Sequence, residues 1–199
     1  MRSSQQPNFR KSVKARRPAP PLNGVKLQEM ALAYVARFST SAARLERYLA
    51  RKLHERGWDD EGERPEPSAI AASFVELGYI DDASYARARS SSLLRRGYGG
   101  RRVEQTLWHD GIDAALREEL APDAAAARHA ALKLAQKRRF GPFSAEPPDL
   151  PQREKQIAAM LRAGHSLDIV RQIVNATSAD AALEWAHELD AEEPHDPFI

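Results

Sequence analysis

Large apolar side chains recur along the chain at the spacing of an amphipathic helix. From Leu27 to Phe38 they fall at i, i+3, i+4, i+7, i+8 and i+11, which places them in one stripe on one face of a helix. Helical patterns also precede three glycines further along, Gly57, Gly111 and Gly164. The pattern therefore predicts a chain built mainly from short amphipathic helices.

The three glycines mark an internal repeat, because they lie 54 and 53 residues apart. Apolar residues precede Gly57 and Gly111 by eight and four positions, whereas before Gly164 the matching pair, Ile157 and Leu161, is displaced by one position. Each glycine is followed by an apolar residue and then by a helix-starting residue, except that His165 takes the apolar position after the third glycine. A glycine after a helix adopts a left-handed conformation that turns the chain. We therefore expect each of these glycines at a bend between two helices.

The helices around each glycine group into a unit of three. Units are expected at residues 27–81, 82–121 and 122–177. Their predicted helices span 27–38, 41–56 and 67–77 in the first unit, 83–96, 101–110 and 113–120 in the second, and 123–139, 151–163 and 167–175 in the third.

Both ends of the chain differ in composition from this body. Residues 1–26 are polar, basic and punctuated by proline, and are expected to form a disordered arm. Residues 178–199 are expected to form an acidic tail, in which 179–189 is a candidate short helix. Because units this small bury little surface alone, they must stack on their neighbours. The predicted fold is all-α: an elongated, curved array of three tandem three-helix units with a long concave surface.

The composition supports several small helical cores. Val, Ile and Thr total only 17 residues, whereas Ala, Leu, Arg and Glu total 92, and the second group favours helices over sheets. Leu, Ile, Val and Phe number just 39, too few for one deep core. The absence of cysteine excludes a disulfide scaffold, a thiolate zinc site and a cysteine nucleophile.

The net charge of +2 conceals a segregated pattern. Residues 1–58 carry a net charge of +10 and residues 83–139 carry +6, while residues 59–82 and 176–199 carry −7 each. Two separate basic tracts indicate a partner rich in phosphate or carboxylate, although solvated helix faces would give the same pattern. No apolar run or leader segment indicates a membrane span or a secretory signal, so we expect a cytoplasmic protein.

No arrangement of residues indicates catalysis, a metal site or a cofactor. The six histidines are scattered, with no HExxH pattern and no pair at i, i+4. The acidic stretch from Asp59 resembles a calcium loop, but Arg64 and Ile70 stand where such a loop needs Gly and Glu. We therefore expect a protein that is not an enzyme.

Arginines at helix ends provide the candidate binding site. Cations at a helix C-terminus are stabilised by the helix dipole, which accounts for Arg95 and Arg96. Arg101, Arg102 and Arg44 instead fall in the first turn of a helix, where the dipole disfavours them, and this indicates capture of an anionic group rather than a tolerated surface charge. The candidate residues for binding a filament or nucleic acid are Arg101, Arg102, Tyr98, Arg44, Arg47, Arg95, Arg96, Arg138 and Arg139. Tyr98 is suited either to stacking on a base or to packing over the turn.

The segment from Gly78 to Asp113, GYIDDASYARARSSSLLRRGYGGRRVEQTLWHDGID, resembles the central motif of the RecX family. The resemblance extends over residues 27–175, and the family has the same three-unit helical repeat. Departures include Arg44 and Thr106, at positions where the family tends to have Glu, and the basic N-terminal arm.

The resemblance implies a non-enzymatic, monomeric regulator of the bacterial recombinase RecA. Such a protein lies in the helical groove of the RecA filament on single-stranded DNA and restrains filament extension, ATP hydrolysis, strand exchange and cleavage of the SOS repressor. The alternative is a direct DNA-binding protein with helix-turn-helix-like units, because each helix pair around a glycine turn resembles that motif.

Overall fold

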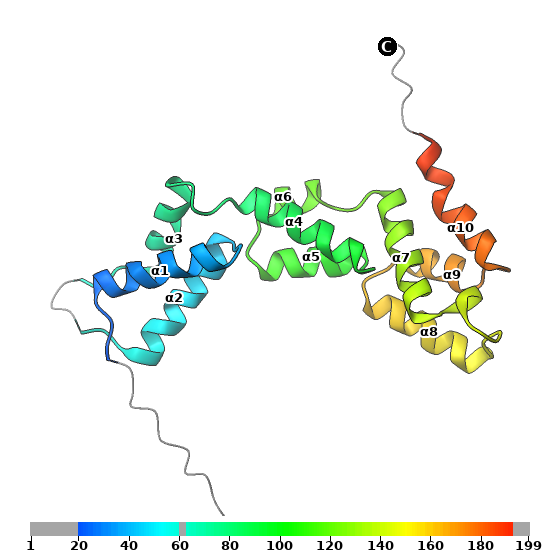
Figure 1. Ribbon diagram of the computed structural model, residues 1–199, viewed down its shortest axis with the longest axis horizontal. Helices are drawn as coiled ribbons and strands as arrows, with labels where there is room; N and C mark the ends of the chain where they lie inside the picture. The colour runs from blue at the N-terminus through cyan, green and yellow to red at the C-terminus, as the bar shows by residue number, and fades with distance from the viewer. Residues whose placement is uncertain (1–19, 60–62, 193–199) are drawn as a thin grey trace, which may run out of the picture.

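Three helical units follow one another along a bowed row (Figure 1). The computed structural model describes residues 20–59 and 63–192, and it is all-α as the sequence predicts. None of the helices in these two ranges is both long and apolar enough to cross a membrane. Residues 1–19 of the disordered arm expected at 1–26, and residues 193–199 at the end of the expected tail, lie outside the described residues.

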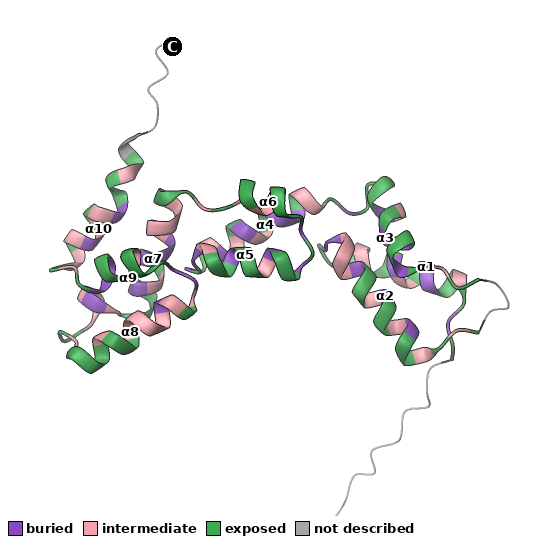
Figure 2. Ribbon diagram, turned by 180° about the vertical axis from the view of Figure 1, so that it is seen from behind, coloured by how far each residue is buried: buried purple, intermediate pink, exposed green. Residues whose placement is uncertain are grey.

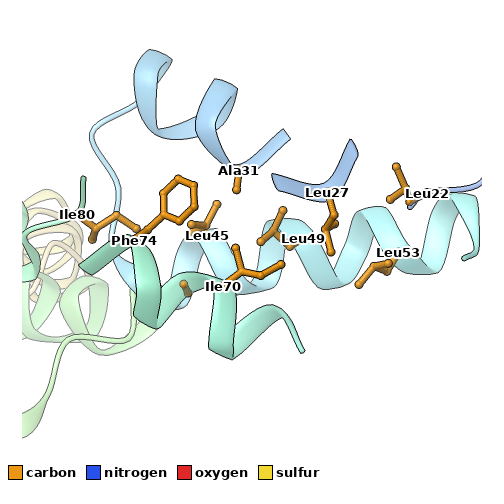
Figure 3. Close-up of a cluster of buried hydrophobic side chains, with 10 residues drawn as sticks. Leu22, Leu27, Ala31, Leu45, Leu49, Leu53, Ile70, Phe74 and Ile80 are labelled. Carbon is orange, nitrogen blue, oxygen red and sulfur yellow. The ribbon is translucent and has the colours of Figure 1, made fainter. Parts of the chain in front are cut away.

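The first unit comprises α1 (Gly24–Arg37), α2 (Ala42–Arg56) and α3 (Pro67–Glu76). The side chain of Asn23 accepts a hydrogen bond from the amide of Lys26, and Ser41 caps α2 in the same way, so each helix begins where a side-chain oxygen satisfies a free amide. Figure 3 shows the core between the three helices, which is made of leucines from α1 and α2 facing Ile70 and Phe74 of α3.

The segment before α1 corrects the expected boundary of the basic arm at residue 26. Leu22 is fully buried in the first core, and its amide donates a 2.9 Å hydrogen bond to the carbonyl of Gly57. The amide of Asp59 donates back to the carbonyl of Leu22, also at 2.9 Å. The segment 57–59 therefore fixes the residues before α1 against the first unit. Asp59 pairs with Leu22 and does not start a helix.

The second unit comprises α4 (Asp82–Arg95), α5 (Gly100–His109) and α6 (Ala114–Glu119). Asp81 caps α4 and Asp113 caps α6 through side-chain oxygens. The core is small and is formed by residues of all three helices and the turn before α6. Its buried members are Tyr85, Ala86, Leu93, Val103, Leu107 and Ile112.

The third unit contains four helices rather than three. Asp123 caps α7 (Ala124–Arg138), a capping box at Asp149 begins α8 (Leu150–Arg162), and α9 (Leu167–Val174) follows. A 3₁₀ turn, η1 (Gly141–Phe143), lies between α7 and α8.

The expected acidic tail at 178–199 begins instead with α10 (Ala179–His187) and the 3₁₀ helix η2 (Glu188–Glu192). Ala182 and Ala186 are buried in the third core, where α10 packs on α7. The short helix expected from residues 179–189 is therefore confirmed, but it belongs to the unit and the unit does not end at residue 177.

Buried residues form three separate clusters, one inside each unit (Figure 2). This agrees with the small supply of large apolar side chains, which predicted several small cores.

All three repeat glycines lie at bends between helices, with φ values of 76° at Gly57, 81° at Gly111 and 97° at Gly164. The displaced register expected before Gly164 is wrong, because the fully buried residue there is Met160, four positions before the glycine. Leu53 and Leu107 occupy the same offset in the other two units. A methionine thus fills the position that the apolar pattern had missed.

The second helices of the units, α8, α5 and α2, meet end to end along the lower edge in Figure 1. The amides of Gly99 and Arg101 at the start of α5 donate to the carbonyls of Ala163 and Gly164 at the end of α8, at 3.0 and 3.2 Å. These bonds satisfy amides that a helix N-terminus otherwise leaves without an intrahelical partner. At the other junction, the Ser41 hydroxyl at the start of α2 donates to the Asp110 carbonyl at the end of α5.

The glycine at each junction also permits a close approach by the next unit. A Cβ atom on Gly111 would lie 2.2 Å from the Cβ atom of Ala43, and one on Gly164 would lie 2.5 Å from the amide nitrogen of Arg102. Both distances are far below van der Waals contact. The turn that bends the chain is therefore also the surface on which the neighbouring unit docks.

Candidate functional site

Positive charge is concentrated in the first and second helices of the units. Together α2, α5 and α8 carry ten Lys and Arg residues and four acidic residues. The first helices, α1, α4 and α7, carry nine and two, whereas α3, α6, α9 and α10 carry two and six. In Figure 1 the outer ends of α2 and α8 reach below α5, so this row follows the concave side of the arch. The row of second helices therefore carries a net positive charge along the concave side of the arch.

A basic pocket lies at the junction of the first and second units. Its volume is about 420 Å³, and arginines of α2 line it together with two tyrosines, the stacked pair Tyr34 and Tyr48, whose ring centroids are 4.3 Å apart. The lining residues are Tyr34, Arg44, Arg47, Tyr48, Arg51, His109 and Asp110. Two predicted residues, Arg44 and Arg47, meet here, while Arg51 and His109 were not predicted because sequence spacing does not show which helices face each other.

Arg44 has a structural partner that the sequence did not reveal. Its guanidinium donates to the Asp110 carboxylate at 3.0 Å and to the Tyr85 hydroxyl at 3.2 Å, across the junction. An ion pair therefore offsets the unfavourable position of this cation at a helix N-terminus, and capture of an outside anion is no longer needed to explain it.

Asp110 is the centre of this junction, and only 3% of the residue is exposed. The Tyr85 hydroxyl donates to it at 2.7 Å, and Arg89 lies 3.5 Å away. Burial and the Asp110 carboxylate raise the pKa of Tyr85 to about 12, so the phenol remains a donor. Among the groups around Asp110, Arg44 comes from the first unit, so its ion pair with this buried carboxylate links the two units.

A second basic pocket, of about 320 Å³, lies at the junction of the second and third units. Its lining residues are Arg96, Tyr98, Leu134, Lys137, Arg138, Phe140, Ala159, Arg162 and Ala163. The guanidinium of Arg96 lies over the ring of Tyr98, 5.6 Å from its centroid. Within the described part of the chain, no carboxylate lies within 4.0 Å of Lys137, Arg138 or Arg162.

The structure therefore brings three of the predicted residues together, Arg96, Tyr98 and Arg138. Arg162 was not predicted, because it lies on α8, far along the sequence from the other basic residues of this pocket. Unpaired cations beside a tyrosine form a site suited to an anionic group with a flat or apolar neighbour.

The remaining predicted residues lie outside these two pockets. Arg95 donates to Ser91 at 2.6 Å and Arg102 to Gln105 at 3.1 Å, both on the exposed surface of their own helices. Arg139 ends α7 in a left-handed conformation, with φ of 55°. Arg101 is one of the residues that line a third, more apolar pocket of about 550 Å³ between the second and third units.

His165 is the buried titratable group in the wall of that third pocket. Only 2% of it is exposed, and Nε2 lies 3.0 Å from the carbonyl of Gly97 in the preceding unit. A carbonyl only accepts hydrogen bonds, so Nε2 carries a proton and donates. Burial lowers the pKa of His165 below its usual value of 6.5, partly opposed by the hydrogen bond to Gly97.

We expect stability to depend on pH through this residue. The folded pKa lies below the unfolded one, so the unfolded chain binds more protons at acidic pH. The free energy of unfolding should therefore be highest above pH 6.5 and decrease as the pH falls below that value, by about 1.4 kcal/mol per unit of pKa depression at most. Urea unfolding of the wild type and of His165→Gln across this range measures the effect. A wild-type slope no steeper than that of His165→Gln would contradict it.

Comparison with known proteins places this fold and sequence in a family. A family model described as RecX, second three-helix domain, matches residues 81–120, which form the second unit. The regulatory protein RecX of Myxococcus xanthus is 31% identical over 164 residues, covering 77% of this chain and 86% of the relative. The regulatory protein RecX of Mycobacterium sp. strain JLS is 31% identical over 158 residues, covering 76% and 84%.

Solved structures share the fold. The crystal structure of RecX from Lactobacillus salivarius matches with a TM-score of 0.55 and 22% identity over 84% of this chain and 96% of that chain. A second crystal structure, of a regulatory protein RecX, matches with the same TM-score and 19% identity over 75% and 72%. The arched row of helical units is thus an architecture that these proteins share, and the extent of the sequence similarity shows that the chain belongs to the RecX family.

Proposed function

We propose that the chain regulates the RecA recombinase by lying in the helical groove of the RecA filament on single-stranded DNA. The observation that carries the proposal is the row of α2, α5 and α8, which places an excess of positive charge along the concave side of an extended arch. A long, curved, basic surface fits a long and anionic partner better than it fits a small molecule.

The two junction pockets divide this surface into two contact points. Each pocket contains arginines and at least one tyrosine, and each lies where two units meet. Because they are separated along the arch by the second unit (Figure 1), one molecule would contact more than one protomer of a filament. Such a monomer in the cytoplasm would restrain filament extension, ATP turnover, strand exchange and SOS repressor cleavage by occupying the groove, without catalysis of its own.

A comparison of two ligands tests the proposal. Affinity is measured for naked single-stranded DNA and for RecA filaments on the same DNA at physiological salt, while ATP turnover by RecA is followed. We expect tighter binding to the filament and slower turnover. Equal affinity for both ligands with unchanged turnover would reject the groove model and favour a direct DNA-binding protein.

The structure gives little support to that alternative. In a helix-turn-helix unit the helix after the turn reads base edges, yet α3 has no basic residue and α9 has only Arg171. Arg117, the one basic residue of α6, pairs with Glu104 at 2.9 Å. Nonspecific contact with DNA phosphates by the basic row remains part of the proposal.

Charge reversal at the start of α5 should weaken filament binding without unfolding the protein. Acidic residues stabilise a helix N-terminus, so Arg101→Glu with Arg102→Glu is expected to fold at least as stably as the wild type. Loss of two contacts should weaken binding at physiological salt by about tenfold or more. If both contacts are to single-strand phosphates, the slope of log affinity against log salt should fall by about 1.4.

The matched control is Arg87→Glu with Arg171→Glu, which changes the charge equally at two exposed positions outside the basic row. It should bind nearly as the wild type does. Equal weakening by both double variants would show that net charge, and not the start of α5, determines binding.

A further inference from the structure

Two histidines that are far apart in the sequence meet at the outer end of the third unit. His129 lies on α7, and His187 is the last residue of α10, with their ring centroids 4.7 Å apart. Asp190, in η2, lies between them: its Oδ1 is 2.6 Å from Nε2 of His129 and its Oδ2 is 2.8 Å from Nδ1 of His187. The fold thus assembles a cluster that no local spacing in the sequence indicates.

The donor atoms of this cluster suit a transition metal ion. One atom from each of the three side chains lies within 4.8 Å of the other two. Two imidazole nitrogens and one carboxylate oxygen are a usual ligand set for zinc, which then takes a water molecule as its fourth ligand. All three side chains are partly open to solvent, at 34%, 55% and 44% exposure, so an ion and its water have access.

Neighbouring contacts hold the three residues in place. Arg128, next to His129, donates to the carbonyl of Trp185 at 2.8 Å and to the Glu188 carboxylate at 3.0 Å. Its guanidinium also lies 4.2 Å from the centroid of the Trp185 ring. These contacts fasten the end of α10 to α7, so the backbone positions of the donors are set before any ion binds.

The carboxylate of the cluster is ready to act as a ligand. Each of its two oxygens faces one imidazole nitrogen, Oδ1 that of His129 and Oδ2 that of His187. A divalent ion bound to the same three atoms would take the place of the shared protons, and its binding would therefore release protons.

We propose that His129, His187 and Asp190 form a binding site for a divalent zinc-type metal ion, which joins α10 and η2 to α7. Because these ligands come from elements on both sides of the contact, the bound ion would stabilise the packing of the last helix on the third unit. The site lies on a different part of the third unit from the basic pocket lined by Arg96 and Arg138, and it does not depend on the proposed role in RecA regulation.

Zinc titration of the full, tag-free chain tests the proposal. Calorimetry should show one equivalent of Zn²⁺ bound per chain at this site, and Zn²⁺ should raise the melting temperature. His129→Ala with His187→Ala should lower the affinity at least tenfold, since loss of even an outer-shell partner costs about 10–100-fold. The control is His54→Ala with His109→Ala, which removes two exposed histidines elsewhere and should bind as the wild type does.

Asp190→Asn keeps the size of the side chain, so it provides a second test if the double histidine variant fails to fold. It should also weaken Zn²⁺ binding, and Co²⁺ added to the wild type, but not to this variant, should give the visible absorption of a tetrahedral site. Absence of Zn²⁺ binding by the wild type, or equal binding by the wild type and the double histidine variant, would overturn the proposal.

Discussion

Replacing Gly164 by alanine is expected to lower the free energy of unfolding by about 2–5 kcal/mol. The φ value of 97° places this residue in a region that costs an L-residue about 1–2 kcal/mol. The added methyl group would also overlap the backbone of Arg102, 2.5 Å from its amide nitrogen, and overpacking of this kind costs about 1–3 kcal/mol. The hydrogen bonds from Gly99 and Arg101 to the end of α8 would lengthen as the two units move apart.

A second glycine, Gly78, separates the cost of the backbone conformation from the cost of the steric overlap. Gly78 has a φ of 75°, but an added Cβ atom there meets nothing within 4 Å. Gly78→Ala should therefore lose only about 1–2 kcal/mol, the backbone share. Chemical denaturation of the three proteins gives the comparison, and hydrogen exchange at the start of α5 reports the junction directly. Equal losses for both alanine variants would show that the close approach of Arg102 contributes nothing.

Replacing Asp110 by alanine is expected to cost about 3–5 kcal/mol, because it removes one side of a buried charge network. The side chain of Asp110 is 4% exposed, and three groups turn toward it: the guanidinium groups of Arg44 and Arg89 and the hydroxyl of Tyr85. Without the carboxylate these donors would remain at the junction without an acceptor. The junction of the first and second units would lose its ion pair and keep the hydrogen bonds of Ser41 to the main-chain carbonyl at 110 and of the Ala42 amide to Asp82, so the first unit should unfold at a lower temperature than the other two.

A double-mutant cycle identifies the source of that loss. Arg44→Ala should cost less than Asp110→Ala, since the side chain of Arg44 is 36% exposed and solvent screens its charge. The combined variant should lose less than the sum of the two, because the arginine no longer lacks a partner. Additive losses in calorimetry would mean that the two residues do not interact. Asp113→Ala, which removes only the cap of α6, serves as the control and should lose about 1 kcal/mol.

The sequence predicted the helices and their bends well because both depend on short-range chemistry. Capping residues such as Ser41, Asp81 and Asp113 and the turn glycines act within a few residues of their own position. The apolar stripe found the core of the first unit at Leu27 and Ala31, although Phe38 at its end is 55% exposed. It failed at Met160, where the neighbouring Leu161 fits a helical stripe equally well and only packing decides which residue is buried.

Features that depend on contacts between distant segments were not predicted. Leu22 lies in a polar stretch, and its burial depends on pairing with the residues after Gly57. The last helix is rich in small residues and acids, so nothing local indicated that Ala182 and Ala186 would fill a core. The partner of Arg44 and the meeting of His129 with His187 likewise follow from how the helices pack.

Main-chain atoms form one part of the contact between the second and third units, beside the hydrogen bond of the His165 side chain to Gly97. That part consists of two amides, two carbonyls and a missing Cβ atom, and none of these depends on which side chains surround them. Mutation can therefore replace most residues around this joint and leave the angle between the units as it was. An arch built on such joints can keep its curvature while its surface changes to follow a changing partner.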